Sequence, residues 1–343
     1  MTNSPGASPR DRIVLAFAGD LESSIVVPWL AETEDAEVVA VTLDFGQSRD
    51  LEGIRDRALT LGAVRAHVLD VRAEFARDYL LPALKAGALY GGGRRLAAAL
   101  GHAAIARTLV EIADIEHATR VAHGGITSAA RLTAAVQSLK PACTVLAPVR
   151  EWGGGRAQLL EYAASRGLSL PVSGLDAPGG VAPPTNPTAR RAAEAAVVDI
   201  TFKAGTPVAI NNVGMPLLDL IGSLDFLAGK NGVGRADRFE TPAASVLAAA
   251  HDDLQQLAAT ADVNDSSDTV GHQYAALVDN GGWFSVLRAA LDAYVDKAQH
   301  LLNGIVRVKL FQGACEIVHS HIRDVDGQEN DGYSVVRPLR YRA

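Results

Sequence analysis

The sequence predicts an α/β protein in which helices cover both faces of a parallel sheet, followed by a second domain of α+β type. Three observations support this fold class. Apolar runs alternate with helical segments throughout the first half of the chain. A stretch dense in Pro and Gly, 171–188, ends the alternation. Beyond it, hairpin patterns and long helical patterns replace the strand–helix repeat. With 343 residues, the chain is long enough for two hydrophobic cores.

Five apolar runs in the first half are predicted to be strands of the parallel sheet. They are continuously apolar rather than alternating, which is typical of strands buried on both faces. The right-handed crossover rule, with a ligand site at the point where the strand order reverses, places the first run centrally, between the second and the fourth. The runs are 13–18, 37–45, 65–71, 119–125 and 143–149.

Helical segments separate these strands. The first helix begins within 24–32, and the amphipathic segment 52–62 is closed by Gly62. A long helical zone is predicted from 74 to 117, and a further helix lies between the last two strands.

The second domain is predicted to begin near residue 195 with a hairpin over 196–212. A second hairpin, 304–321, turns at Gln312 and Gly313, and helices are predicted at 216–229, 241–259 and 283–302. The predicted organisation is a disordered tail over 1–12, a first domain over 13–172, a linker over 173–194, a second domain over 195–322 and a loose tail over 323–343.

Composition limits the partners of the chain. The net charge of −7 and the pI of 5.7 argue against nucleic acid or an anionic membrane as the main partner. No apolar run reaches the ~20 residues of a membrane helix, and the N-terminus lacks the apolar core of a signal peptide. The two cysteines, Cys143 and Cys315, match no metal-ligand spacing, which favours two buried thiols in a reducing cytoplasm.

A strand, a tight turn and a helix start meet in Ala16–Ser24, whose sequence is AFAGDLESS. Loops of this kind bind phosphate groups through backbone N–H groups at a helix N-terminus. This loop is unusual because it contains two acids, Asp20 and Glu22. A phosphate-binding loop with negative charge needs an explanation.

Several segments, in one order along the chain, resemble the argininosuccinate synthase family, whose members use ATP to join citrulline to aspartate. The resemblance runs from residue 13 to 320 and implies an N-type ATP-pyrophosphatase domain, with an adenine nucleotide alpha-hydrolase-like sheet, over 13–172. It implies a synthetase and multimerisation domain over 195–322, which forms homotetramers in the family. It also implies ATP and Mg²⁺ as cofactors and small amino-acid-like substrates. The segments are DFGQ, EFARDYLLPALKAGALY, VAHGG, APVREW, ETPAASVLAAAH and NGGWFSVLRAALDAYVDKAQHLLNGIVRVKLFQG.

The resemblance assigns ATP binding to the opening loop, to the end of the second strand and to one glycine. The family's loop has the sequence A-Y-S-G-G-L-D-T-S, so Glu22 keeps an acid, whereas Asp20 stands where the family has glycine. Either Asp20 helps to ligate Mg²⁺ bound to the phosphates, or it occupies a turn that aspartate favours. The implied ATP-binding residues are Ala16, Phe17, Ala18, Gly19, Asp20, Leu21, Glu22, Ser23, Ser24, Thr42, Phe45, Gly46, Gln47 and Gly124.

The resemblance assigns substrate binding to Tyr90, Thr127 and Arg131. After His-Gly the family has C-T-G-K-G-N-D-Q-V-R-F-E, where this chain has the shorter GITSAARLT. The Lys, the Asn, the acidic residue and the Glu of that run have no counterpart, and the linker lacks the family's serine-bearing run. The segments that face adenine are therefore kept, the segments that face the amino acids are reduced, and no catalytic side chain is assigned.

Two further patterns have a structural interpretation. His319 and His321 share one face of a predicted strand and lack a third ligand, so they are interpreted as an exposed pair rather than a metal site. Arg150, Glu151 and Trp152 are interpreted as a buried tryptophan with an ion pair that supports the edge of the sheet.

Three functional hypotheses follow. The chain is a diverged ATP-dependent carbon–nitrogen ligase that releases AMP and pyrophosphate, with authentic citrulline–aspartate ligation weakened or replaced. Alternatively, it is a paralogue that binds a nucleotide or metabolite without turnover. The third hypothesis is an oligomeric relative without a ligand. The first hypothesis predicts pyrophosphate release with some pair of amino acids. The second predicts thermal stabilisation by ATP without pyrophosphate release, and the third predicts neither.

Overall fold

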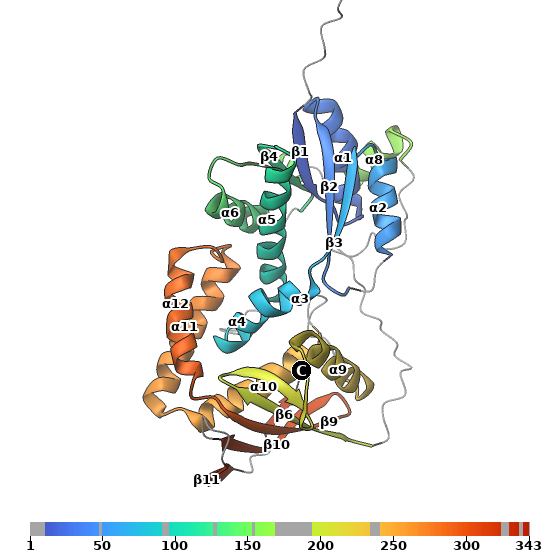
Figure 1. The fold of residues 1–343 in the computed structure, drawn as a ribbon. Helices are drawn as coiled ribbons and strands as arrows, with labels where there is room; N and C mark the ends of the chain where they lie inside the picture. Colours follow the sequence, from blue (N-terminus) through green and yellow to red (C-terminus); the bar gives the residue numbers. More distant parts are fainter. Residues whose placement is uncertain are drawn as a thin grey trace, which may run out of the picture. The chain divides into compact units, whose positions relative to one another are not determined.

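The computed structural model describes residues 11–47, 50–90, 96–125, 129–152, 155–168, 194–233, 241–323, 329–335 and 339–342. The chain forms two compact units (Figure 1). The first comprises residues 1–71, 101–182 and 280–284, and the second comprises 72–100, 183–279 and 285–343. Residues 72–100 thus belong to the second unit, within the range that the sequence predicts as one continuous first domain. The predicted tail 1–12 and linker 173–194 lie almost wholly outside the described residues.

The first unit contains a five-stranded parallel sheet with the order β3-β2-β1-β4-β5. Strand β1 pairs with β2 and with β4, so that Leu15 lies beside Ala40 on one side and Ala122 on the other. The predicted central position of the first strand, between the second and the fourth, is therefore confirmed. The strands are β1 (Arg12–Ala16), β2 (Glu37–Asp44), β3 (Arg65–Asp70), β4 (Arg120–His123) and β5 (Thr144–Leu146).

Helices cover both faces of this sheet because successive residues of each strand point to opposite sides. Ile13 and Leu15 enter one core with Leu21 and Ile25. Val14, between them, enters the other core with residues of α5 and α6. The helices of this unit are α1 (Leu21–Thr33), α2 (Leu51–Thr60), α5 (Ala97–Ile115, from residue 101 on), α6 (Ala129–Leu139), α7 (Pro148–Glu151) and α8 (Arg156–Ser165).

The predicted helical zone 74–117 is not one helix. It consists of α3 (Arg72–Phe75), the π-helical turn η1 (Ala76–Leu80), α4 (Leu81–Lys85) and, after a break, α5. Gly87 ends the first part because its φ of +63° is left-handed, a conformation that glycine adopts without strain. The alanine-rich composition of the zone hid this interruption.

The second unit contains an antiparallel sheet with the order β11-β10-β9-β6-β7-β8, and β12 also pairs with β10. Both predicted hairpins are present. The β6–β7 turn has positive φ at Ala204 and Gly205, and the β9–β10 turn has positive φ at Gln312 and Gly313, the backbone geometry of tight hairpins. The strands are β6 (Ala196–Lys203), β7 (Thr206–Ile210), β8 (Val213–Gly214), β9 (Gly304–Phe311), β10 (Ala314–Arg323), β11 (Glu329–Val335) and β12 (Leu339–Arg342).

Two features of this unit differ from the sequence prediction. Helix α11 (Ala261–Asp279) was not predicted, because its sequence is rich in Asp, Ser and Thr and has a Gly near its middle. The tail that was predicted to be loose contains β11 and β12, which pair with β10 and so satisfy an otherwise open strand edge. The predicted helices correspond to α9 (Leu217–Lys230), α10 (Pro242–Ala258) and α12 (Val286–Gln299).

A buried carboxylate joins three elements at the amino end of the parallel sheet. The side chain of Glu116 is 2% exposed and accepts hydrogen bonds from Arg65 Nη1 at 2.7 Å and from Arg12 Nη1 at 3.1 Å. Burial alone would raise the pKa of Glu116, but the hydrogen bond and charge of Arg65 and the charge of Arg12 hold it below its usual value. The carboxylate therefore stabilises the folded state above its ordinary pKa, and this contribution is lost as the pH falls through the lowered value.

Replacing Glu116 with Gln should destabilise the protein by about 2 kcal/mol, since charge-assisted hydrogen bonds are lost while the partly exposed arginines remain solvated. The measurement is urea unfolding at pH 7. Glu111→Gln is the matched control, because Glu111 lies in the last turns of α5, shortly before Glu116, and its pair with Arg107 is exposed. The control should change stability by less than about 0.5 kcal/mol. Equal effects of the two variants would contradict a special role for the buried carboxylate.

Candidate nucleotide-binding site

The loop between β1 and α1 lies at the carboxyl end of the central strand, where ligands bind in open parallel sheets. Its backbone is anchored to β2 on one side. Phe17 N donates to Val41 O at 2.8 Å, and the Thr42 hydroxyl donates to Phe17 O at 2.8 Å. Within the loop, Ala18 N donates to Ser23 Oγ at 3.2 Å. These hydrogen bonds within the protein fix the conformation of the loop backbone.

Asp20 is the N-cap of α1. Its backbone is extended, and its Oδ1 accepts a hydrogen bond from Ser23 N at 2.9 Å. Aspartate is among the best N-cap residues because its carboxylate satisfies a free helical N–H and interacts favourably with the positive end of the helix. The interpretation of Asp20 as a residue in a turn that it favours thus matches the geometry. A phosphate at this helix end would compete with the carboxylate for the same N–H.

Most side chains of the loop serve the fold, which leaves the backbone as its binding surface. Phe17 and Leu21 are buried in the hydrophobic core below the sheet edge. Ser24 is fully buried, and its hydroxyl has no hydrogen-bond partner within the described part of the chain. The loop can therefore present backbone N–H groups to an anion, with Gly19 in the left-handed region at φ +70°.

Gly124, which follows β4, packs directly on the first turn of α1. A Cβ at this position would lie 2.7 Å from Ser23 N and 2.8 Å from the carbonyl carbon of Glu22. Both contacts are with backbone, so they cannot be relieved by a side-chain movement. Gly124 therefore brings the β4 end against the opening loop, and this places two of the implied ATP-binding segments in contact.

Gly124→Ala should move the first turn of α1 and destabilise the protein by about 1–3 kcal/mol through overpacking. ATP binding should weaken more than overall stability, because the displaced turn carries the loop. The measurements are thermal unfolding and calorimetric ATP affinity. Gly101→Ala is the control, since a Cβ there meets no atom within 4 Å, and it should be neutral or stabilising. Unchanged ATP affinity in Gly124→Ala would contradict this role.

The DFGQ segment forms a turn closed by its own side chains. Gly46 N donates to Asp44 Oδ1 at 2.7 Å, and Phe45 N donates to Gln47 Oε1 at 2.6 Å. The Gln47 amide also donates to Leu43 O at 2.8 Å. Gly46 requires its positive φ of +85°. Since the polar side chains stabilise the turn, contact with an adenine here would come from backbone and from the ring of Phe45.

A cluster of one arginine and two histidines lies near the carboxyl end of β4. Arg131 Nη1 is 3.4 Å from His102 Nδ1, and His123 Nδ1 accepts from Gly125 N at 3.1 Å. His123 is 3% exposed, and its Nε2 has no partner among the described residues. Burial first, and then the charge of Arg150, lower the pKa of His123 to about 4. Burial and the charges of Arg131 and His123 likewise lower the pKa of His102 to about 4. Both imidazoles are neutral at pH 7.

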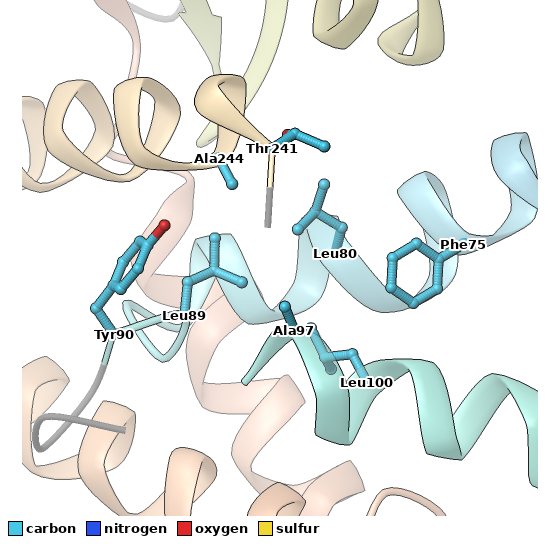
Figure 2. A pocket seen from close by; sticks show the side chains of 8 residues that line it. All are labelled: Phe75, Leu80, Leu89, Tyr90, Ala97, Leu100, Thr241 and Ala244. Atoms are coloured by element: carbon cyan, nitrogen blue, oxygen red, sulfur yellow. The ribbon is translucent and has the colours of Figure 1, made fainter. Parts of the chain in front are cut away.

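The other predicted substrate residues lie elsewhere. Thr127 falls outside the described residues. Tyr90 belongs to the second unit, where its hydroxyl is 3.2 Å from Ser245 Oγ. Tyr90 lines a cavity of about 50 Å³, and Figure 2 shows its side chain among the other lining residues. The cavity is predominantly apolar, which suits hydrophobic packing better than recognition of a charged amino acid. Its other lining residues are Phe75, Leu80, Leu89, Ala97, Leu100, Thr241 and Ala244.

Two minor interpretations of the sequence are corrected by the structure. His319 and His321 stack with ring centroids 6.5 Å apart, but both are half-buried rather than exposed. Trp152 is 40% exposed rather than buried. Its ring packs edge-on against that of Tyr162, with the two ring centroids 4.8 Å apart. In the described part of the chain, no group of three or more His, Cys, Asp or Glu side chains is placed to hold a metal ion.

Sequence reasoning missed two residues of the site, Arg57 and His102. Arg57, on α2, donates from Nη1 to Gly19 O at 2.7 Å, and His102, on α5, lies against Arg131. The only signal in the sequence was a polar residue on a helix that begins or ends near a ligand-binding edge.

No helix among the described residues is long and apolar enough to span a membrane.

The five-stranded parallel sheet, with its loop at the centre, is that of a HUP domain, and it is joined to a synthetase-type domain built on an antiparallel sheet. The "Arginosuccinate synthase N-terminal HUP domain" model matches residues 12–169, and the C-terminal domain model of the same family matches 175–324. The chain therefore belongs to the argininosuccinate synthase family.

Similar full-length proteins agree with this assignment. Argininosuccinate synthase of Streptococcus thermophilus is 37% identical in an alignment that is 350 positions long, gaps included, and covers 90% of this chain and 87% of that protein. The enzyme of Streptococcus agalactiae is 35% identical over 353 residues, covering 91% and 88%. That of Symbiobacterium thermophilum is 37% identical over 348 residues, covering 89% and 86%.

Proposed function

We propose that this protein is an ATP-dependent carbon–nitrogen ligase of the argininosuccinate synthase type, acting on small amino-acid-like substrates in arginine biosynthesis. The proposal rests on the agreement between the family to which the chain belongs and the position of its candidate phosphate-binding loop. Both family domains are matched, and the loop that would hold the phosphates lies at the carboxyl end of the central strand. The tight contact of Gly124 with the first turn of α1 supports a preserved binding edge.

The residues of the first unit fit the parts of such a site. Backbone N–H groups of the Ala16–Ser24 loop would hold the phosphates, and the turn at Phe45 and Gly46 would hold the adenine. When bound, ATP supplies the adenylyl group that activates a ureido or carboxyl oxygen, with release of pyrophosphate, before an amine displaces AMP. This activation depends on positioning and charge neutralisation more than on a nucleophilic side chain. Arg131 offers a guanidinium for a substrate carboxylate.

Mg²⁺ is the metal that we propose for this site, bound through the phosphates. A carboxylate oxygen is the type of ligand that Mg²⁺ prefers, and of the two acids on the loop Asp20 is the one that stands where the family has glycine. Its Oδ1 is engaged by Ser23 N, so a role in metal binding would fall to the other oxygen. A divalent ion would also offset the repulsion between this acid and the phosphates.

A second candidate function is nucleotide binding without turnover. The capped loop favours it, because the Asp20 carboxylate already satisfies an N–H that a phosphate would use. The reduced substrate segment after Gly125 and the apolar surroundings of Tyr90 point the same way. Such a protein would act as a regulator or partner subunit.

Pyrophosphate release separates these two functions. The assay would contain ATP, a panel of ureido acids and a panel of amino acids, with and without Mg²⁺. A ligase releases pyrophosphate with at least one pair. A protein that only binds nucleotide shows a thermal shift with ATP and no pyrophosphate with any pair. If the protein shows neither pyrophosphate release nor a thermal shift with ATP, both functions are excluded.

We also propose a homo-oligomer, a tetramer by analogy with the family, assembled through the second domain. Val286 and Leu287, adjacent at the start of α12, are 88% and 54% exposed, and exposed apolar neighbours of this kind favour association. Light scattering at micromolar concentration should give a mass well above the 35.9 kDa of one chain, and Val286→Asp should lower it. A monomeric mass for the unmodified protein would contradict the proposal.

A further inference from the structure

Arg57 connects helix α2 to the opening loop. Its Nη1 donates a hydrogen bond to the carbonyl oxygen of Gly19 at 2.7 Å. The loop also packs closely on this helix, since a Cβ on Gly19 would lie 3.0 Å from Ile54 Cγ1 and 3.3 Å from Arg57 Nη1. Gly19 is therefore packed against two residues of α2.

This hydrogen bond sets the orientation of the peptide between Gly19 and Asp20. In a trans peptide the C=O and the N–H point in opposite directions, and no cis peptide occurs among the described residues. Because the Gly19 carbonyl points to Arg57, the Asp20 N–H points to the side away from α2. Glycine at φ +70° has little intrinsic resistance to rotation of this peptide, so an external contact is needed to hold it.

The guanidinium of Arg57 also makes the electrostatic potential at the loop more positive. Arginine is positively charged at any physiological pH, and here it contacts the residue that precedes the acidic N-cap Asp20. A positive charge behind the loop opposes the negative charge that Asp20 adds. The two effects act together, since one orients an N–H donor and the other lowers the electrostatic cost of an anion at that donor.

We infer that Arg57 is a positioning residue for a polyphosphate ligand: it fixes the Gly19–Asp20 peptide with its N–H toward the ligand and compensates for the acid on the loop. This inference rests on the proposed nucleotide site and adds a residue to it. It predicts that Arg57 matters for ligands with phosphate groups and is indifferent to ligands without them.

The test compares ATP with adenosine, as ligands with and without phosphates, by calorimetry at low salt. Arg57→Met should weaken ATP binding by tenfold or more and leave adenosine affinity within twofold of the unmodified protein. Arg57→Lys should recover part of the ATP affinity, since an ammonium restores the charge and one donor. Arg55→Met is the matched control, because Arg55 is an exposed arginine on the same helix, and it should change neither affinity.

The outcomes are distinguishable. If Arg57→Met binds ATP as tightly as the unmodified protein, the inference is wrong while the nucleotide site stands. Equal weakening of ATP and adenosine would show a general structural role and would also overturn the inference. If the unmodified protein binds neither ligand, the proposed function fails, and the inference fails with it.

Discussion

Asp20→Asn should tighten ATP binding at least tenfold in the absence of Mg²⁺, which corresponds to about 1.4 kcal/mol. Asparagine caps helices as well as aspartate does, so the helix start is preserved while the charge is removed. Two unit charges ~4 Å apart at an effective dielectric of ~20 repel by roughly 4 kcal/mol, and partial exposure of the loop reduces this figure. The gain should shrink with added salt or Mg²⁺, because both screen the same charge.

Asp20→Gly separates capping from charge. This variant removes the carboxylate and also frees Ser23 N, to which Asp20 is now bonded. ATP affinity should therefore rise at least as much as in Asp20→Asn, while the free energy of unfolding changes by only a few tenths of a kcal/mol. Calorimetric titration of the three proteins, with and without Mg²⁺, is the measurement. Tight binding by the unmodified protein that is independent of Mg²⁺ would show that Asp20 does not face the phosphates.

The protein should lose stability steeply between pH 6.5 and pH 4. His251 is buried on α10, with its Nε2 2.8 Å from Gln299 Oε1, and burial first, followed by the charge of Lys85, lowers its pKa to about 4. In the unfolded chain the pKa returns to its ordinary value of 6.5. The unfolded state therefore binds more protons in this window, and stability falls as the pH falls. His251 alone contributes about 2 kcal/mol of loss between pH 7.5 and pH 5.

His251→Gln should flatten this pH dependence. Glutamine does not titrate and can still donate a hydrogen bond to Gln299, so the loss between pH 7.5 and pH 5 should shrink by about 2 kcal/mol. Urea unfolding at the two pH values measures it. His272→Gln is the control, because His272 is exposed on α11, and its removal should leave the dependence unchanged. The buried His102 and His123 account for part of the remaining slope. An unchanged slope in His251→Gln would show that this histidine takes up its proton as readily in the folded state as in the unfolded state.

The parallel sheet could be predicted from the sequence because its strands β1 and β2 are buried on both faces. Continuous apolar runs such as the one containing Val14 have few alternatives, and the handedness of crossovers, with a ligand site where the strand order reverses, then places the first strand between the second and the fourth. Both hairpins could be predicted for a similar reason, since turns such as Gln312–Gly313 have a strong local signature. In these elements local sequence and tertiary structure agree.

The failures occur where tertiary structure overrides local pattern. Helix α11 has a polar sequence with weak helix propensity, and its formation depends on the packing of residues such as Tyr274 against α12. Most of the zone 74–117 is rich in alanine and leucine and has strong helix propensity, yet it breaks near Gly87. The tail after Arg323 lacks an apolar pattern, and pairing with β10 decides its structure.

The candidate site shows the same division. Asp20 could be recognised as unusual from the sequence, because it departs from the family's glycine. Its hydrogen bond to Ser23 N explains how the fold accommodates it. The contacts of Arg57 with Gly19 and of His102 with Arg131 join residues that are distant in the chain. No local pattern predicts such contacts, so they required the structure.

The central claim is that the chain couples ATP cleavage to formation of a carbon–nitrogen bond. The most direct measurement is an incubation with ATP, Mg²⁺, citrulline and aspartate, followed by the panel of other ureido and amino acids, with AMP, pyrophosphate and the ligated product quantified by mass spectrometry. We expect one AMP and one pyrophosphate for each molecule of product, with at least one substrate pair. Saturated ATP binding without AMP or product for any pair would contradict the claim and favour a nucleotide-binding protein without turnover.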